Sequence, residues 1–186
     1  MRRLDFLRMS GLLGVGSIFS SFKSASDKTQ PKALDAEMQA KIDAAGLTGS
    51  VFDLKAEPIQ KVRIALFGLG NRGQSLIDML NWLVQEGHAE ITAISDVNPA
   101  KIAKAQDQIQ GFQSKEPAIF TGNESAWEAA MSEDIADLAL ICTPWEWHTK
   151  MALKAMENGL HAASEVPIAY TPEDSINLVK TAEATQ

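Results

Sequence analysis

The stretch KVRIALFGLGNRG, residues 61–73, carries the clearest structural signal in this 186-residue chain. An apolar run typical of a buried strand ends at Gly68, and Gly70 and Gly73 follow before a helical pattern begins. Gly68 permits a tight turn, Gly70 lets the backbone approach a pyrophosphate, and Gly73 lets the helix pack closely on the strand. Free amides at the helix start favour an anion. We therefore predict a dinucleotide-binding turn, the alternative being an ordinary strand-to-helix connection.

A second apolar run, His88 to Ser95, ends at Asp96, about 20 residues beyond the glycines. Asp96 is placed to accept hydrogen bonds from the ribose hydroxyls of NAD, and a carboxylate there repels the extra phosphate of NADP. We therefore predict NAD as the cofactor. Alternatively, Asp96 caps the helix that starts near Pro99, because Asp and Asn favour caps and Pro favours the first turn. Both roles are compatible.

Strand-like runs alternate with helical patterns from Lys61 to the end of the chain. This alternation predicts an α/β fold of the Rossmann type, a doubly wound parallel sheet with helices on both faces. After the first two strands, further strands are expected at residues 117–121, 137–142 and 160–164. Helices are expected after the glycine turn, over residues 102–109, 123–132 and 148–156, and from Thr171 onward in the capping style.

The first 26 residues have the form of an export signal. Arg2 and Arg3 lead, Met9 to Phe19 is apolar and glycine-rich, and small residues continue through Ser26. The apolar run is shorter than the roughly 20 residues that span a bilayer, so no stable membrane span is expected in the mature chain. The paired arginines resemble a twin-arginine signal, with Asp5 as one extra residue. We expect a periplasmic protein, the alternative being a buried amphipathic start.

Composition limits the class of protein and the kinds of partner. The chain is 45% apolar and 22% charged, as expected of a globular domain, and its net charge of -7 without a basic patch makes nucleic acid an unlikely partner. Residues 27–60 are expected to form a leader arm and linker, with a short helix near Leu34 to Ala44. Cys142, the only cysteine, lies in an apolar run, so we expect a core thiol and no disulfide. No metal site is predicted.

Two polar segments follow the fourth and fifth expected strands, where open α/β sheets bind ligands. Tryptophans at such a position are often plain packing residues, but here they flank a polar Glu and His, so we predict contact with the cofactor. The predicted residues are Thr143, Pro144, Trp145, Glu146, Trp147 and His148 after the fourth strand, and Glu165 and Val166 after the fifth.

Together the segments GLGNRG, DVNPAK, TPWEWH and EVP resemble the Gfo/Idh/MocA superfamily, and within it they look most like glycoside hydrolase family 109. The resemblance covers about residues 61–186, and TPWEWH is its most specific part. It implies NAD contacts at Asn71 and Arg72 in the glycine turn, at Asp96, along Trp145 to His148, and at Glu165 and Val166.

One position departs from the wider superfamily. Many sugar dehydrogenases that resemble this chain carry Glu-Lys-Pro after the fifth strand, with the lysine acting as an acid-base group near the substrate hydroxyl. Val166 stands at that position here. Because valine cannot transfer a proton, the lysine-dependent alcohol dehydrogenase mechanism is excluded at this position. Family 109 shares the non-lysine pattern.

The resemblance to family 109 implies hydrolysis of terminal α-linked N-acetylgalactosamine, with NAD recycled through oxidation at the sugar C3, elimination, addition of water and reduction. It also implies a second α/β substrate domain, absent from this chain, which would hold the glycan, supply most catalytic residues and mediate any homo-oligomer. Catalytic residues are therefore not assigned here. His148 is expected near the nicotinamide or as a residue that orients the cofactor. His88 and His161 are assigned to the surface or to packing.

Two other functions stay open. The chain is alternatively part of an NAD-dependent oxidoreductase that acts on a sugar or cyclitol, or it is a non-catalytic cofactor-binding module. Turnover of an α-N-acetylgalactosaminide without net NADH production would separate the glycosidase from the oxidoreductase.

Overall fold

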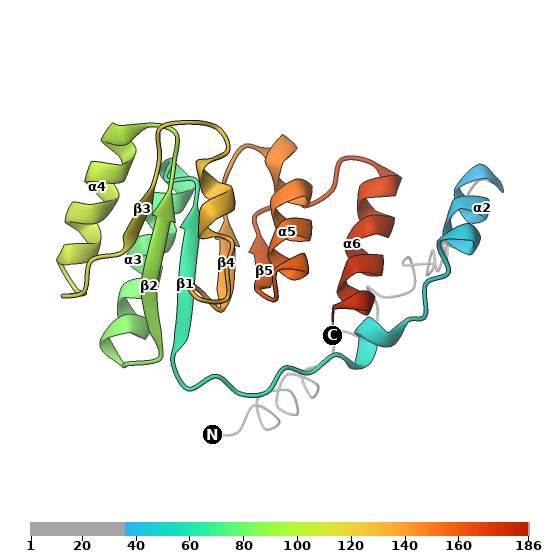
Figure 1. Cartoon of the computed structure of the whole chain (residues 1–186), viewed down its shortest axis with the longest axis horizontal. Coiled ribbons are helices and arrows are strands. Elements are labelled where there is room, and N and C mark those ends of the chain that lie inside the picture. Colours follow the sequence, from blue (N-terminus) through green and yellow to red (C-terminus); the bar gives the residue numbers. More distant parts are fainter. Residues whose placement is uncertain (1–35, 186) are drawn as a thin grey trace, which may run out of the picture. The chain divides into compact units, whose positions relative to one another are not determined.

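The computed structural model describes residues 36–185, whose centre is a five-stranded parallel sheet (Figure 1). The strand order is β3-β2-β1-β4-β5. The chain thus moves outward from β1 to β3 and returns to β4 on the other side of β1. Diverging connections at such a reversal open a crevice beyond the strand ends. The strands are β1 (Val62–Phe67), β2 (Ala89–Ser95), β3 (Ala118–Phe120), β4 (Leu138–Ile141) and β5 (His161–Ser164).

Helices cover both faces of the sheet, as the sequence predicts. Ile64 and Leu66 of β1 pack in one buried cluster with α3 (Asn71–Gln85) and α4 (Pro99–Gln110). Ala65 and Phe67, which alternate with them, pack in a second cluster with α5 (His148–Glu157) and the 3-10 helix η2 (Ala126–Ala130). The doubly wound Rossmann architecture is confirmed.

Helix starts follow the capping chemistry of the sequence. In α6 (Pro172–Ala184), the Thr171 hydroxyl accepts from the Asp174 amide and the Asp174 carboxylate accepts from the Thr171 amide, a complete capping box. At α4 the capping residue is Asn98, whose side chain accepts from the Ala100 amide at 2.9 Å. Asn98, and not Asp96, is therefore the N-cap of α4, so the Asp96 carboxylate remains available for other contacts.

The expectation of a helix over residues 123–132 is wrong. The structure has only the 3-10 helix η2 there, and the Asn123 carboxamide accepts from the Ser125 amide in the turn before it. Trp127 and Ala130 are buried on the sheet. A short 3-10 turn suffices because the chain has only to place these two side chains before it returns to β4.

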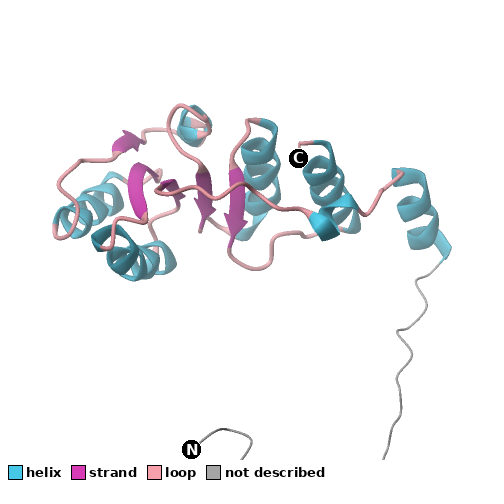
Figure 2. Ribbon diagram, turned by 90° about the horizontal axis from the view of Figure 1, so that it is seen from below, coloured by secondary structure: helices cyan, strands magenta, loops and turns pink. Residues whose placement is uncertain are grey.

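The segment before β1 contains the expected short helix, α2 (Ala36–Ala45), and the 3-10 helix η1 (Ser50–Asp53). Seen from below, residues 54–61 pass across the amino-terminal side of the sheet (Figure 2). The expected export signal, residues 1–26, lies outside the described residues. Within residues 36–185 no helix has the length and apolar character needed to cross a membrane.

Candidate cofactor site

The three glycines of the turn meet different surroundings. Gly68 has a φ of 86°, and a Cβ there would lie 2.6 Å from the carbonyl oxygen of Cys142. A Cβ on Gly73 would collide with the carbonyl oxygen of Gly68. A Cβ on Gly70, by contrast, would meet nothing within 4 Å. Gly68 and Gly73 are therefore required by the protein's own packing, whereas Gly70 leaves open space at the start of α3.

That open space has the features a pyrophosphate needs. Gly70 is the N-cap of α3 and provides no side-chain cap, so the amides of the first turn, which begins with Asn71, are left to a ligand. Arg72 lies in the same turn and its Nε donates to the Glu165 carboxylate at 2.5 Å. The structure thus joins the glycine turn to the end of β5. The residues present fit a dinucleotide.

Asp96 lies at the carboxyl end of β2 with only 6% of its side chain exposed. Its carboxylate accepts from the Leu69 amide and from the Asn98 amide, both at 2.8 Å, and Lys101 Nζ lies 3.7 Å away. Asp96 therefore ties the glycine turn to the start of α4. A carboxylate has about four acceptor positions, so these bonds leave capacity for a ribose hydroxyl.

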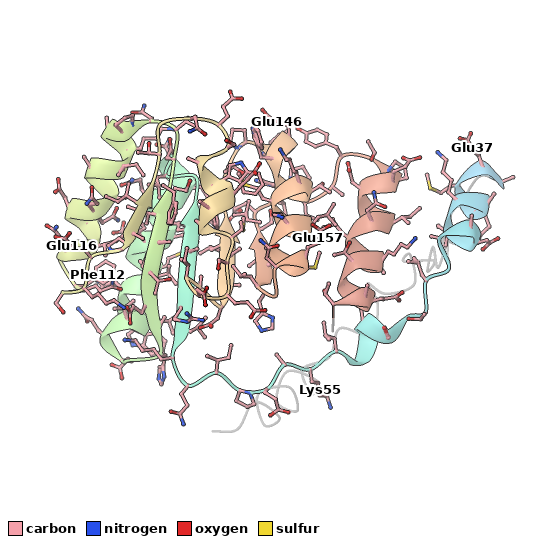
Figure 3. The ribbon with its side chains drawn as sticks, viewed as in Figure 1. Glu37, Lys55, Phe112, Glu116, Glu146 and Glu157 are labelled. Atoms are coloured by element: carbon pink, nitrogen blue, oxygen red, sulfur yellow. The ribbon has the colours of Figure 1, made fainter. Side chains whose placement is uncertain are left out.

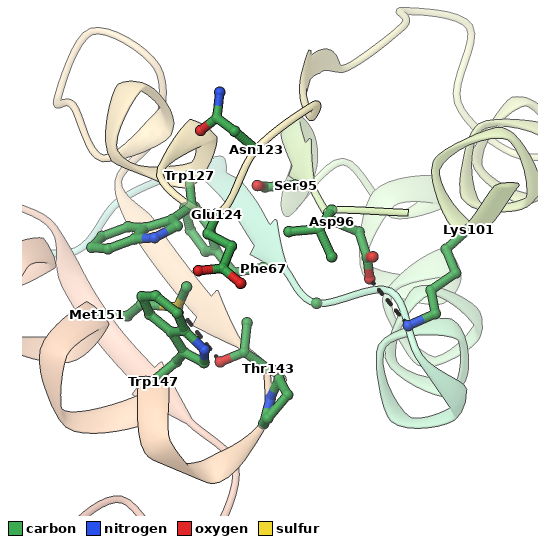
Figure 4. A pocket seen from close by; sticks show the side chains of 13 residues that line it. Phe67, Ser95, Asp96, Lys101, Asn123, Glu124, Trp127, Thr143, Trp147 and Met151 are labelled. Carbon is green, nitrogen blue, oxygen red and sulfur yellow. Dashed lines mark hydrogen bonds and ion pairs between the residues drawn. The ribbon is translucent and has the colours of Figure 1, made fainter. Parts of the chain in front are cut away.

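A cavity of about 260 Å³ opens beside Asp96, beyond the ends of β1, β2 and β4 (Figure 4). Most of its exposed lining is apolar, and its charged groups are Asp96, Lys101 and Glu124. The cavity has room for one end of a dinucleotide. The lining residues are Phe67, Gly68, Ser95, Asp96, Val97, Lys101, Asn123, Glu124, Trp127, Thr143, Pro144, Trp147 and Met151.

The residues of the TPWEWH segment lie in three environments: the cavity beside Asp96, a groove near Tyr170, and, for His148, the interior. Thr143, Pro144 and Trp147 line the cavity. Trp145 is outside this cavity. It is 56% exposed, and its ring lies 6.3 Å from that of Tyr170. Glu146 lines a shallow groove there and points outward in Figure 3. Only part of the segment therefore faces the cavity beside Asp96.

His148 is buried, with 1% of its surface exposed. Its Nε2 lies 2.8 Å from the carbonyl oxygen of Thr143 and its Nδ1 lies 2.9 Å from that of Pro167. The ring thus connects the loop after β4 with the loop after β5. This geometry favours a positioning role over direct contact with a ligand.

Two neighbouring residues at the end of β5 differ in their contacts. The Glu165 carboxylate accepts from Arg72, while Val166 is 79% exposed. Cys142, behind this edge, packs against the cluster that contains α3, and burial raises the pKa of its thiol to about 12. The thiol is therefore protonated at neutral pH and behaves as a core residue.

The loop after β3 brings Asn123, Glu124 and Trp127 to the cavity, and none of these three residues is among those predicted from the sequence motifs. Trp127 meets Trp147 edge to face with ring centroids 6.3 Å apart, and Lys150 Nζ lies 5.4 and 5.0 Å from the two rings. A signal was available, since the carboxyl end of every parallel strand reaches the ligand edge, including the third.

A parallel sheet with this order, a glycine turn at the first helix and an acidic residue after β2 define a dinucleotide-binding Rossmann domain. Residues 62–186 match the family model described as "Oxidoreductase family, NAD-binding Rossmann fold". The chain belongs to the Gfo/Idh/MocA oxidoreductase family, and its domain binds NAD.

Among curated proteins the chain is similar to members of glycoside hydrolase family 109. It is 34% identical over 186 residues to glycosyl hydrolase family 109 protein 1 of Shewanella sp. (strain MR-4). It is 33% identical over 186 residues to alpha-N-acetylgalactosaminidase of Shewanella oneidensis. Both alignments cover 100% of this chain and 38% of the relative, so the chain spans well under half the length of these proteins.

Solved structures give the same fold. The WlbA dehydrogenase of Chromobacterium violaceum, in complex with NADH and UDP-GlcNAcA, matches with a TM-score of 0.57 and 25% identity, over 71% of this chain and 35% of that one. A levoglucosan dehydrogenase, in complex with NADH and levoglucosan, matches with a TM-score of 0.53 and 24% identity, over 68% of this chain and 33% of that one.

Proposed function

We propose that this chain is the NAD-binding part of a glycosidase that releases terminal α-linked N-acetylgalactosamine. The observation that carries the proposal is Val166, which is exposed beside the ion pair of Arg72 and Glu165 at the end of β5. A valine cannot transfer a proton, so this edge orients a cofactor without the lysine of the related sugar dehydrogenases. Similarity to the alpha-N-acetylgalactosaminidase of Shewanella oneidensis supports the same hypothesis.

The chain's own residues hold and orient the cofactor in this proposal. NAD would supply reversible oxidation of the sugar, which permits elimination of the aglycone. The start of α3 would bind the pyrophosphate, Asp96 the adenosine ribose, and the loop after β5 the nicotinamide end. Proton transfer and sugar recognition would come from residues outside this chain.

Turnover measurements test the proposal on the natural polypeptide that contains this chain, purified with its bound NAD. We expect para-nitrophenol to be released from para-nitrophenyl α-N-acetylgalactosaminide without net accumulation of NADH. In D₂O the released sugar should carry deuterium at C2, because elimination removes that proton. Release of para-nitrophenol without this label would contradict the mechanism.

An NAD-dependent sugar or cyclitol oxidoreductase is the second candidate. The similarity to the WlbA dehydrogenase, whose structure contains NADH and a UDP-sugar, favours it. It predicts one NADH per sugar oxidised and no cleavage of the glycoside. The same assay therefore separates the two candidates.

We also propose that residues 1–26 direct export to the periplasm. The paired arginines ahead of an apolar, glycine-rich run support this proposal. Cell fractionation should place the protein in the periplasm with its first residues removed. Replacing Arg2 and Arg3 together by Lys should retain it in the cytoplasm, and unchanged export of that variant would contradict a twin-arginine route.

A further inference from the structure

Glu124 directs a carboxylate into the cavity beside Asp96 (Figure 4). The side chain comes from the loop after β3, which the glycosidase proposal does not use. Among the residues that the structure describes, none donates a hydrogen bond to this carboxylate or forms an ion pair with it. Glu124 is exposed at the cavity, so water solvates its carboxylate when no ligand is bound, and the carboxylate is free to accept from a donor on a ligand.

The position of Asp96 decides which end of NAD the cavity receives. In this class of domain the acidic residue after β2 contacts the ribose of the adenosine half. The cavity starts at Asp96, and its volume of about 260 Å³ is too small for the whole dinucleotide. The cavity therefore receives the adenine base, while the pyrophosphate crosses the start of α3.

The walls of the cavity suit a flat base. Its apolar lining includes Val97, which is exposed at the start of the connection to α4, and Pro144 and Trp147 from the loop after β4. Apolar groups from two different connections can thus cover the faces of a ring, and its edge is then left for polar contacts. Glu124 is the acidic side chain available to that edge, since Asp96 is already bonded to two amides.

We propose that Glu124 accepts a hydrogen bond from the exocyclic 6-amino group of adenine and thereby selects adenine over hypoxanthine. A carboxylate can only accept, and the 6-amino group is the donor on the edge of the adenine base. In hypoxanthine a carbonyl oxygen replaces that amino group and repels a carboxylate placed there, which can regain a donor only by shifting to the neighbouring N1–H. The inference rests on NAD binding alone and not on glycosidase activity.

The test compares the affinities of NAD and nicotinamide hypoxanthine dinucleotide for the full chain by isothermal titration calorimetry. We expect NAD to bind about tenfold more tightly, as one charge-assisted hydrogen bond at a partly exposed site provides. Glu124→Gln should reduce this ratio to within about threefold, because an amide can donate to the carbonyl as well as accept. Glu116→Gln removes another exposed charge, outside the cavity, and should leave the ratio unchanged (Figure 3).

A second comparison needs no substitution. AMP should bind the unaltered chain more tightly than IMP by the same factor, and each ligand should perturb the fluorescence of the cavity residues Trp127 and Trp147. Equal affinities within either pair of ligands, or a tenfold preference that persists in Glu124→Gln, would overturn the role of Glu124 while leaving NAD binding intact. Failure of NAD itself to bind would overturn the site as a whole.

Discussion

Gly70 and Gly73 differ in what a methyl group would meet, and this difference separates binding from folding. Gly70→Ala places its Cβ in open space at a backbone conformation that alanine adopts, so thermal stability should change little. The methyl group would then occupy the path of the pyrophosphate, and NAD affinity should fall at least about tenfold. Gly73→Ala, the matched variant, should destabilise the fold by about 1–3 kcal/mol because its Cβ collides with the Gly68 carbonyl.

Titration calorimetry with NAD and thermal denaturation of both variants test these two expectations. If the Gly70→Ala variant binds NAD with the native affinity, the pyrophosphate does not pass over Gly70.

Asp96 combines a cofactor role with a structural one. Asp96→Ala should weaken NAD binding about tenfold and relax the discrimination against NADP, because the carboxylate that repels the extra phosphate is lost and Lys101 remains nearby. It should also lower the free energy of unfolding by about 1–3 kcal/mol, since the Leu69 and Asn98 amides lose their acceptor. Titrations with NAD and NADP measure the ratio. An unchanged preference would show that the ribose assignment is wrong.

Sequence alone revealed residues whose role follows from local chemistry. The glycines and Asp96 lie at strand ends, and their spacing predicts a dinucleotide turn wherever the sheet is built. It could not show that Asp96 bonds to Leu69, because that contact joins two strand ends that only the folded sheet brings together. Glu124 and Trp127 were missed because their loop carries no local motif, and only its position after the third expected strand marks it as part of the ligand edge.

The imidazole of His148 links the loop after β4 to the loop after β5. The Nε2 of His148 lies 2.8 Å from the carbonyl oxygen of Thr143 and its Nδ1 lies 2.9 Å from that of Pro167, so the rigid ring spans the two loops. His148→Gln retains one donor group and should leave one carbonyl unpaired, at a cost of about 1–3 kcal/mol in the free energy of unfolding. Amide hydrogen exchange over residues 143–147 and 165–168 should accelerate together.

His88→Gln is the control for this change, because His88 is exposed and lies far along the chain from both loops. NAD affinity should fall in His148→Gln and stay unchanged in His88→Gln. Acceleration of exchange in one loop only would show that the imidazole does not couple them.

Element types were predictable because apolar periodicity and caps act within a few residues. The capping box of α6 and the buried stripe of α4 lie where the pattern indicates them. The 3-10 helix η2 replaced an expected α-helix because its geometry is set by the distance back to β4, which no local pattern encodes. The order of strands likewise comes from the sheet as a whole.

Acid stability of the whole domain should depend on the ion pair between Arg63 of β1 and Asp137, the residue before β4. The Arg63 side chain donates to the Asp137 carboxylate at 2.6 and 3.1 Å, and the Arg63 amide donates at 2.8 Å. These bonds hold the pKa of Asp137 below its ordinary value of 3.8. The stabilisation is therefore complete above pH 3.8 and is lost as the pH falls through the lowered pKa.

Asp137→Asn should be less stable than the native chain at neutral pH and should lose less stability between neutral pH and pH 3 (about one unit below the ordinary value). Urea denaturation at both pH values measures this. Asp107→Asn, at an exposed position of α4, should follow the native chain.

Two carboxylates of α6, those of Glu173 and Glu183, bind the segment before β1. Glu183 of α6 accepts from the Thr48 amide at 3.0 and 2.9 Å and from the Gly49 amide at 2.6 Å. These amide bonds hold the pKa of Glu183 below its ordinary value of 4.5, so the attachment persists above that pH and weakens as the pH falls through the lowered pKa. Glu183 therefore anchors Thr48 and Gly49 to α6.

Release of this anchor should expose the arm without disturbing the cofactor site. Trypsin cleavage after Lys55, an exposed residue of the arm (Figure 3), should become several times faster in Glu183→Gln, because a neutral amide is a weaker acceptor for two backbone amides. NAD affinity should stay at the native value, since Glu183 lies outside the cavity. Glu157→Gln on α5 removes an exposed charge with no anchoring contact and should be cleaved at the native rate. Equal cleavage of all three proteins would mean that the neighbouring pair of Lys41 and Glu173, 2.5 Å apart, suffices to hold the arm.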